Sequence, residues 1–258
     1  MPASRTRRAA PAVVRGLAAI AGHQRAITIL QAHRAAGRLA HAYCLTGEEG
    51  IGKTAVARAL AEELLLGEGQ PPRLEVHPDF WCDDRAEAIS IDEIRFHPER
   101  GAPAHDQSLQ QFLSLKPFVA PLRVALLANA ERMTEAAQNC LLKTLEEPPP
   151  NTVLVLTTAY PDHLLPTCLS RCQLIALSPV GRPALAEFIK ARHDNEAEAE
   201  ALFVLLIQFC QRSLKHRIVF RRMAIVALFF EGQRGQLGRV GANSWVGVDD
   251  LHPLTIWK

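Results

Sequence analysis

The feature that most constrains the fold is a glycine-rich loop in the first quarter of the chain. Residues 42–60 read AYCLTGEEGIGKTAVARAL, in which a short apolar run leads into Gly47-x4-Gly52-Lys53-Thr54 and then into a helical pattern. This is a complete Walker A pattern, and it stands between a strand and a helix, as phosphate binding requires. The stretch therefore predicts a nucleotide-binding P-loop.

Each position of this loop has a predicted role. Gly47, Gly50 and Gly52 let backbone N–H groups close around phosphate oxygens, beside the positive end of the following helix. Lys53 reaches the outer phosphates, and Thr54 can ligate Mg²⁺. We expect ATP as the ligand, accompanied by Mg²⁺. A glycine turn with an unrelated lysine is the alternative, and the strand–loop–helix context disfavours it.

The acidic partner of such a loop is missing from its usual place. Hydrolysis needs a carboxylate at the end of a neighbouring strand to hold Mg²⁺, and a second acid to orient the attacking water. The strand at 122–130 reads LRVALLANA and offers Ala128 and Asn129 instead. Asn129 cannot act as a base, and we expect Glu131 to lie too far along the turn to replace it. The sequence predicts a nucleotide binder with weak or no turnover.

Short apolar runs alternate with helical patterns along the chain, which is typical of a parallel sheet covered by helices. Strand-like runs lie at 41–47, 122–130, 152–159 and 173–179. Between the second and third of them, Thr134 is a candidate helix N-cap and the prolines at 148–150 are a helix stop. From about residue 179 the pattern is only helical. We expect an α/β domain followed by a small helical region.

Composition narrows the class of protein. The 258 residues are 48% hydrophobic with a formal net charge of +2, which allows a large core and gives no argument for binding nucleic acid or membranes. The arginine-rich start predicts a basic arm at 1–18, and the apolar runs are too short or too charged to span a bilayer. Six cysteines without a CxxC pair favour free thiols over a zinc site. We expect a cytoplasmic protein that does not bind membranes.

Two further segments give the chain a family resemblance. RMTEAAQNCLLKTLEEPPPNTVLVLTT (132–158) and LLPTCLSRC (164–172), together with the P-loop, resemble the bacterial clamp-loader ATPases of the AAA+ superfamily, and most of all the DNA polymerase III subunits of the delta-prime type. The resemblance implies an AAA+ P-loop domain at 19–178, with a parallel sheet flanked by helices. A partial helical lid and a divergent tail would occupy 179–258, and we expect no counterpart of the family's collar domain.

The resemblance also implies roles for single residues. Arg171 of the SRC motif corresponds to an arginine finger, whose forked donors enter the ATP site of a neighbouring subunit. A local ion pair is the alternative role for this arginine. Thr157 or Thr158 matches the family's sensor position near the γ-phosphate, although threonine is common at strand ends. Ala128 and Asn129 mark a degenerate Walker B motif.

The resemblance implies a stator-like subunit of the DNA polymerase III holoenzyme, whose enzyme class is that of a DNA-directed DNA polymerase. Such a subunit binds ATP with little or no hydrolysis and supplies an arginine finger to a motor subunit while the sliding clamp is loaded on primed DNA. The implied partners are the other subunits of a hetero-oligomeric ring, the clamp, and primer–template DNA through the assembled complex. No zinc is expected.

Three alternative functions stay open. A hydrolysing motor subunit of the gamma/tau type should carry acids at 128 and 129, and a four-cysteine zinc module where this chain reads GEGQPPRLEVHPDF. A small P-loop enzyme of another class, such as a kinase, would need Asp92 or Asp162 as its metal acid, and neither follows an apolar strand. An autonomous DNA-binding protein should show a basic stripe, and the cluster at 215–222 is equally well explained as a solvated helix face.

Two departures from the family pattern affect these expectations. His23 replaces a glutamine in the segment that packs near the adenine, which predicts an altered nucleotide affinity. The segment 96–108 contains two prolines and a glycine and therefore predicts a surface loop. His97 and His105 flank this loop, and we expect them to be solvated rather than bound to a metal.

Overall fold

The computed structural model describes residues 15–67, 74–95 and 107–190. Within these ranges the strands form one parallel sheet of order β2-β3-β4-β1-β5. The strands are β1 (Ala42–Thr46), β2 (Phe80–Asp83), β3 (Arg123–Leu127), β4 (Thr152–Thr158) and β5 (Gln173–Ala176). All but β2 coincide with runs expected from the sequence, so the predicted parallel sheet is confirmed.

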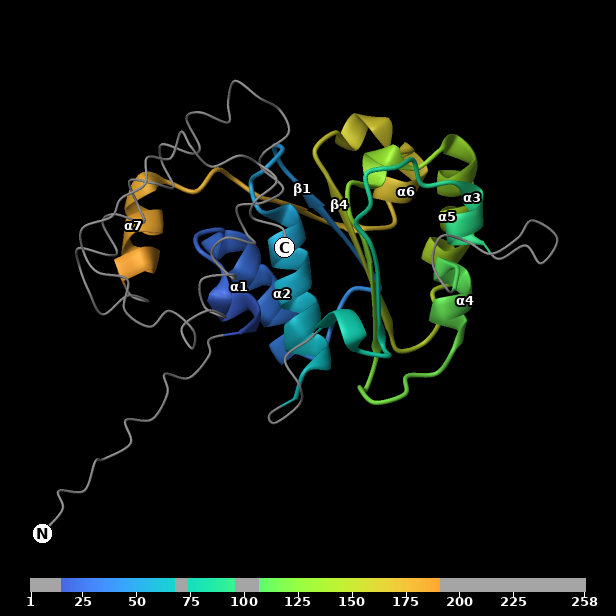
Figure 1. The fold of residues 1–258 in the computed structure, drawn as a ribbon, viewed down its shortest axis with the longest axis horizontal. Coiled ribbons are helices and arrows are strands. Elements are labelled where there is room, and N and C mark those ends of the chain that lie inside the picture. The colour runs from blue at the N-terminus through green and yellow to red at the C-terminus, as the bar shows by residue number, and fades with distance from the viewer. Residues whose placement is uncertain (1–14, 68–73, 96–106, 191–258) are drawn as a thin grey trace, which may run out of the picture. The chain divides into compact units, whose positions relative to one another are not determined.

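Helices cover both faces of the sheet (Figure 1). One face packs against α1 (Gln24–Ala35) and α2 (Lys53–Leu65). The other face packs against α3 (Ile91–Ile94), α4 (Leu109–Ser114), α5 (Glu135–Glu146) and α6 (Pro166–Leu169). The 3-10 turns are η1 (Gly16–Ala19), η2 (Leu74–Val76), η3 (Ala130–Arg132) and η4 (Pro161–His163), and α7 (Arg182–Lys190) follows β5.

Successive side chains of each central strand enter two separate hydrophobic cores. Tyr43 and Leu45 of β1 lie in the core under α1 and α2, whereas Ala42 and Cys44 lie in the core on the opposite face. Every residue of β3 is buried. Burial on both faces explains why these strands read as continuous apolar runs instead of alternating polar and apolar residues.

Helix α5 begins and ends where the sequence predicts. The Thr134 hydroxyl oxygen accepts a hydrogen bond from the backbone N–H of Ala137 at 3.2 Å, which makes it the N-cap. The helix ends at Glu146, just before the prolines at 148–150. Its buried apolar face, with Ala137 and Leu141, packs into the core that also contains α3 and α4.

Several expectations fall on residues outside the described ranges. These are most of the basic arm (1–14), most of the 96–108 loop with His97 and His105, and residues 191–258 with the expected tail. Helix α7 is the described part of the region expected to form the lid, and a domain boundary near residue 178 stays a prediction. No helix within the described ranges combines the length and the apolarity needed to cross a bilayer.

Candidate nucleotide-binding site

The P-loop connects the end of β1 to the start of α2. A side chain at Gly47 would bring its Cβ to 2.8 Å from the carbonyl oxygen of Leu177, and the backbone φ there is +148°. Gly52, the residue before α2, has a φ of 102°, a conformation that side-chain-bearing residues rarely adopt. These glycines are therefore required by close backbone approach and by positive φ. The sequence-based assignment of the loop thus has a local structural reason.

Lys53, the first residue of α2, is folded over the loop. Its side chain is buried, and Nζ donates hydrogen bonds to the carbonyl oxygens of Gly47 and Glu48, both at 2.8 Å. Burial lowers the pKa of the Lys53 ammonium, and the nearby carboxylates of Glu131 and Glu49 act in the opposite direction. The lysine charge is thus held at the loop, where it can meet a phosphate.

Unpaired backbone donors gather around this charge. The first N–H groups of α2, including that of Thr54, have no acceptor inside the helix. The N–H groups of Gly50 and Gly52 likewise have no hydrogen-bond acceptor within the described ranges. Helix α2 has 13 residues, enough for its dipole to favour an anion at this end. Loop, lysine and helix together form an arrangement that can bind phosphate.

The two sensor candidates lie at the carboxyl end of β4, the strand next to β1. Thr157 and Thr158 are fully buried. The Thr157 hydroxyl oxygen accepts from the N–H of Asn129 at 3.0 Å, and the Thr158 hydroxyl oxygen accepts from the N–H of Tyr160 at 3.0 Å. Both hydroxyls therefore hold the backbone of this edge in place, and each still has its own hydrogen to donate.

Strand β3 ends beside β4 in a tight turn that lacks a carboxylate at its first two positions. Ala128 is buried, and Asn129 has a left-handed φ of 53°, which asparagine tolerates. The guanidinium of Arg132 donates to the carbonyl oxygen of Ala128 at 2.8 Å and also to that of Glu87. The turn returns the chain to the sheet, where Glu131 Oε1 accepts from the N–H of Ala159 at 3.4 Å. Glu131 thus lies at the carboxyl end of β4, next to β1 and its P-loop, although it follows β3 in the sequence.

His23 links the start of α1 to the P-loop. Its Nε2 donates a hydrogen bond to the carbonyl oxygen of Ile51 at 2.8 Å, and the residue has a left-handed φ of 53°. The ring lies 3.6 Å from where a side chain on Gly52 would begin. The histidine therefore places its ring directly against the phosphate loop.

Arg171 lies away from this P-loop, between α6 and β5. Its Nη2 is 2.8 Å from Oε1 of Glu146, and Nη1 donates to the carbonyl oxygen of Thr167 at 2.9 Å. The local ion pair that the sequence left open is therefore present. Because β5 runs parallel to β1, Arg171 is at the amino edge of the sheet and the P-loop is at the carboxyl edge. The four residues of β5 separate them by about 13 Å.

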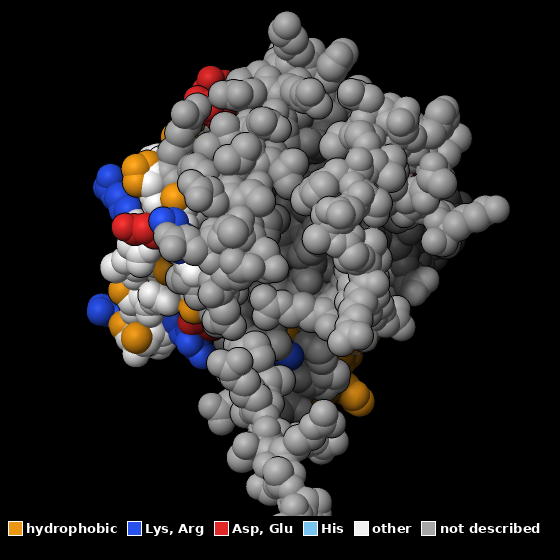
Figure 2. Space-filling model, turned by 60° about the vertical axis from the view of Figure 1, so that its left-hand side comes forward, with side chains coloured by type: hydrophobic (Ala, Val, Ile, Leu, Met, Phe, Trp, Pro, Cys, Tyr) orange, Lys and Arg blue, Asp and Glu red, His pale blue; other side chains and the backbone are white. Residues whose placement is uncertain are grey.

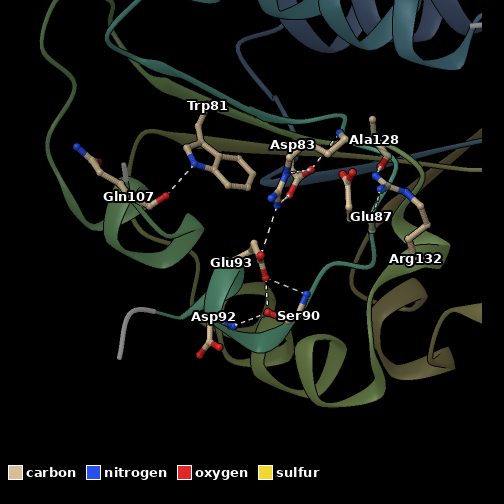
Figure 3. Close-up of polar contacts among 10 residues, drawn as sticks. Trp81, Asp83, Glu87, Ser90, Asp92, Glu93, Gln107, Ala128 and Arg132 are labelled. Carbon is tan, nitrogen blue, oxygen red and sulfur yellow. Dashed lines mark hydrogen bonds and ion pairs between the residues drawn. The ribbon is translucent and has the colours of Figure 1, made fainter. Parts of the chain in front are cut away.

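A second polar cluster, drawn in Figure 3, lies at the end of β2. The buried carboxylate of Asp83 pairs with Arg85 at 2.6 Å, and Arg85 also approaches Glu93 of α3 at 3.5 Å. Ser90 and Glu93 form a capping box at the start of this helix. The cluster fixes α3 to the edge of the sheet, and no motif or residue spacing in the sequence indicates that these charges are buried.

The alternative metal acids do not occupy strand ends. Asp92 lies in the first turn of α3, and Asp162 is exposed in η4. Within the described ranges, no group of three or more His, Cys, Asp and Glu side chains is placed to hold a metal ion. The five cysteines there are free thiols, and Cys210 lies outside these ranges.

The surface bears on the DNA-binding alternative. In the described part of the face shown in Figure 2, Lys and Arg side chains are interspersed with Asp, Glu and apolar side chains. That part of the face therefore lacks the continuous basic stripe that autonomous DNA binding would need. The basic cluster at 215–222 lies outside the described residues.

All of these site residues fall within a match to one protein family. Residues 22–181 match the family model described as DNA polymerase III, delta subunit. The chain belongs to this family. The match includes the P-loop, the ends of β3 and β4, and Arg171, and the expected fold class of an AAA+ P-loop domain with a parallel sheet flanked by helices is confirmed.

Members of the DNA polymerase III delta subunit family and related subunits resemble much of this chain. The DNA polymerase III subunit delta' of Pseudomonas aeruginosa is 37% identical over 182 residues, which cover 65% of this chain and 52% of that protein. The subunit delta' of Bacillus subtilis is 32% identical, covering 78% and 69%. The subunit tau of Escherichia coli is 31% identical, covering 92% and 36%.

The chain thus spans about half the length of the Pseudomonas relative. Among solved structures, a DNA polymerase III gamma subunit-related protein of Thermotoga maritima superposes with a TM-score of 0.48 and 27% identity, covering 63% of this chain and 49% of that one.

Proposed function

We propose that this member of the DNA polymerase III delta subunit family is a clamp-loader subunit of the delta-prime type. It binds ATP with little or no hydrolysis and supplies Arg171 to a neighbouring motor subunit while the sliding clamp is loaded on primed DNA. The observation that carries the proposal is a complete P-loop after β1, in a sheet whose strand β3, one strand further on past β4, ends in Ala128 and Asn129 in place of two acids. The delta' relatives support it.

ATP would be held by the donors gathered at the start of α2. Lys53 and the N–H groups of Gly50 and Gly52 would meet the phosphate oxygens. The Thr54 hydroxyl is half-buried and makes no hydrogen bond within the described ranges, so it fits the role of a Mg²⁺ ligand. Bound Mg²⁺ would neutralise charge on the phosphates.

Turnover would be slow because the edge beside the P-loop lacks a suitable base. A general base must accept a proton from the attacking water, and the amide of Asn129 cannot do so at neutral pH. The N–H of Asn129 also donates to Thr157, which fixes the asparagine backbone against β4. A site of this kind holds its nucleotide without consuming it.

Arg171 would act on another chain. It lies at the opposite edge of the sheet from the P-loop, so it cannot reach its own nucleotide without unfolding this part of the domain. Its partner Glu146 is half-exposed, and such ion pairs contribute only about 0 to 1 kcal/mol. Exchanging Glu146 for the phosphates of a neighbouring subunit would therefore cost little.

This function implies a set of partners. They are the other subunits of a hetero-oligomeric clamp-loader ring, the sliding clamp, and primer–template DNA bound through the assembled complex. The protein would act in the cytoplasm as part of the DNA polymerase III holoenzyme. A partial helical lid and a divergent tail at 179–258 would follow the AAA+ domain at 19–178, and the basic arm at 1–18 would precede it.

A motor subunit of the gamma/tau type is the second candidate. It is favoured by the tau relative, whose alignment covers 92% of this chain. The missing acids at positions 128 and 129 weigh against it, because a motor must hydrolyse ATP itself. Robust ATPase activity of the isolated chain would select this candidate over the first.

The decisive experiment measures the ATPase activity of a ring reconstituted with the cognate motor subunits, clamp and primed DNA. Wild type is compared with Arg171→Ala and with Glu146→Gln after equal incorporation has been verified by gel filtration. An arginine finger contributes about 10³-fold or more to turnover, so Arg171→Ala should lower the activity by at least about 100-fold. Glu146→Gln removes the ion pair but keeps the finger, and should retain full activity.

If both variants lower the activity equally, Arg171 serves only the local ion pair and the finger assignment is wrong. If neither has an effect although wild type joins the ring, Arg171 has no role in trans. ATP binding is tested separately by calorimetry, with Lys53→Ala expected to abolish it.

A further inference from the structure

One carboxylate oxygen beside the proposed nucleotide site is buried without a partner. Glu131 Oε2 is inaccessible to solvent and makes no hydrogen bond within the described ranges. Its other oxygen, Oε1, receives a single long hydrogen bond, 3.4 Å from the N–H of Ala159. Burying a carboxylate oxygen without a donor or cation is unfavourable, and such atoms are rare in native proteins. A hydrogen-bond donor or a cation that binds Glu131 Oε2 would satisfy this oxygen.

The fold brings this oxygen to the edge where the P-loop lies. The left-handed conformation of Asn129 and the short turn η3 carry the chain from the end of β3 back against the end of β4. Strand β4 pairs with β1, with Thr158 opposite Thr46, and the P-loop begins directly after Thr46. Glu131 therefore sits between the strand end that lacks its acids and the loop that would bind phosphate.

The surrounding charges agree with this position. The Glu131 carboxylate opposes the effect of burial on the pKa of Lys53, and it adds to the effect of burial that raises the pKa of Cys44 on β1. It makes no ion pair with Lys53, whose Nζ is bound by the carbonyl oxygens of Gly47 and Glu48. The Glu131 carboxylate thus lies near the loop, while the loop's own lysine is hydrogen-bonded to backbone carbonyl oxygens.

We propose that Glu131 is the carboxylate that holds Mg²⁺ at the nucleotide site of this chain, in place of the missing acid at the end of β3. The proposal rests on the proposed function, since it requires that ATP binds at the P-loop. Mg²⁺ prefers oxygen ligands, keeps part of its hydration shell, and is bound by one or two carboxylates together with substrate phosphates. Glu131, after β3, and Thr54, in α2, would both be ligands of the Mg²⁺ ion.

This assignment separates two tasks that a pair of adjacent acids usually performs together. Glu131 would retain the metal, while Asn129, in the position of the second acid, cannot act as a base. The site would then favour the magnesium complex of ATP over free ATP and still turn it over slowly. Two competing roles for Glu131 make different predictions. They are a cap for the Ala159 N–H and a general charge partner for Lys53.

The test measures ATP affinity by calorimetry on the full chain, once with excess Mg²⁺ and once with EDTA. For wild type, Mg²⁺ should tighten binding by about tenfold, as expected for one charge-assisted contact. For Glu131→Gln this gain should fall to within about twofold, while binding in EDTA stays equal or becomes tighter because a carboxylate no longer repels the phosphates. Glu135→Gln, on the exposed first turn of α5, is the matched control and should behave as wild type.

The outcomes are distinct. If Glu131→Gln weakens binding equally with Mg²⁺ and with EDTA, the role is structural and the proposal is overturned; unchanged binding in both conditions also overturns it. If wild type binds ATP in neither condition, the proposed function itself fails, and this inference with it. Thermal unfolding without nucleotide shows whether Glu131→Gln is folded. If it is not, Glu131→Asp replaces it, and its shorter carboxylate should reduce the magnesium gain without removing it.

Discussion

Replacing Asp79 by asparagine is expected to destabilise the domain by about 3 kcal/mol at neutral pH. Asp79 is completely buried, and its carboxylate accepts hydrogen bonds from the N–H groups of Phe118, Val119 and Ala120 at 2.6, 2.7 and 2.9 Å. One of its oxygens is also 3.6 Å from Nη2 of Arg123. This carboxylate therefore fixes the segment that leads into β3.

The magnitude follows from the contacts that asparagine can and cannot keep. Its single oxygen can accept from two of the three N–H groups, but its NH₂ group then faces the third N–H and the guanidinium. One charge-assisted hydrogen bond contributes about 1.5 to 3 kcal/mol, and breaking a buried ion pair costs about 3 to 5 kcal/mol. Arg123 keeps the carbonyl oxygens of Lys116 and Phe112 as acceptors, so the lower end applies.

The same contacts predict how the effect depends on pH. Burial raises the pKa of Asp79, but the three N–H groups and Arg123 outweigh burial and hold the pKa below its ordinary value. A lowered pKa in the folded state stabilises the fold above the unfolded pKa of about 3.9, and this contribution is lost as the pH falls through the folded pKa. The difference between wild type and Asp79→Asn should be complete at pH 7 and shrink below about pH 4.

Urea denaturation followed by circular dichroism tests this prediction. Asp84→Asn is the matched control, because Asp84 forms a half-exposed ion pair with Arg58 at 2.8 Å that should contribute less than about 1 kcal/mol. In thermal melts, Asp79→Asn should lower the midpoint by roughly 6 to 12 °C. A loss below about 1 kcal/mol at pH 7, or a loss that stays constant down to pH 3, would refute the reasoning.

Three further predictions concern single side chains. His23→Ala should weaken ATP binding by about tenfold in calorimetry, because the Ile51 carbonyl loses its donor, whereas His23→Gln should keep most of the affinity; equal losses would contradict this role. Gln138→Leu should lower the free energy of unfolding by about 2 to 4 kcal/mol in urea, because its buried amide joins the backbone of Met133, before α5, to that of His163 and Leu165 at the end of η4, and a loss below about 1 kcal/mol would count against it. Burial and then the charge of Glu131 raise the pKa of Cys44 to about 12, so this thiol should resist Ellman's reagent at pH 8 until urea is added; rapid labelling of the folded protein would show that it is accessible.

Much of the fold could be predicted because strands that are buried on both faces of a sheet consist almost entirely of apolar residues. Strands β1, β3 and β4 appear as continuous apolar runs, and α5 shows its N-cap at Thr134 and its stop at the prolines. Strand β2 was missed. Phe80–Asp83 has only four residues, with alternating burial at the edge of the sheet, and it ends in aspartate.

Parts of the fold and of the candidate site could not be predicted because they depend on contacts between distant residues. Asp79 binds N–H groups 39 to 41 positions further along the chain, and no local pattern indicates such a pairing. Glu131 was expected to lie too far along the turn to act as a base, and that expectation stays a prediction. Its hydrogen bond from the N–H of Ala159 depends on the left-handed conformation at Asn129 and on the return of η3 toward β4, and neither is visible in residue spacing.

The placement of Arg171 and the P-loop at opposite edges of one parallel sheet has a consequence for symmetry. An assembly in which Arg171 of one chain meets the P-loop of the next repeats head to tail, so every interface joins two different surfaces. Such a heterologous arrangement gives the assembly a direction, because every subunit has the same orientation relative to the next one. In a ring of this kind, a subunit that binds ATP without hydrolysing it would differ from its neighbours. The neighbouring subunits could then be told apart by their position relative to it.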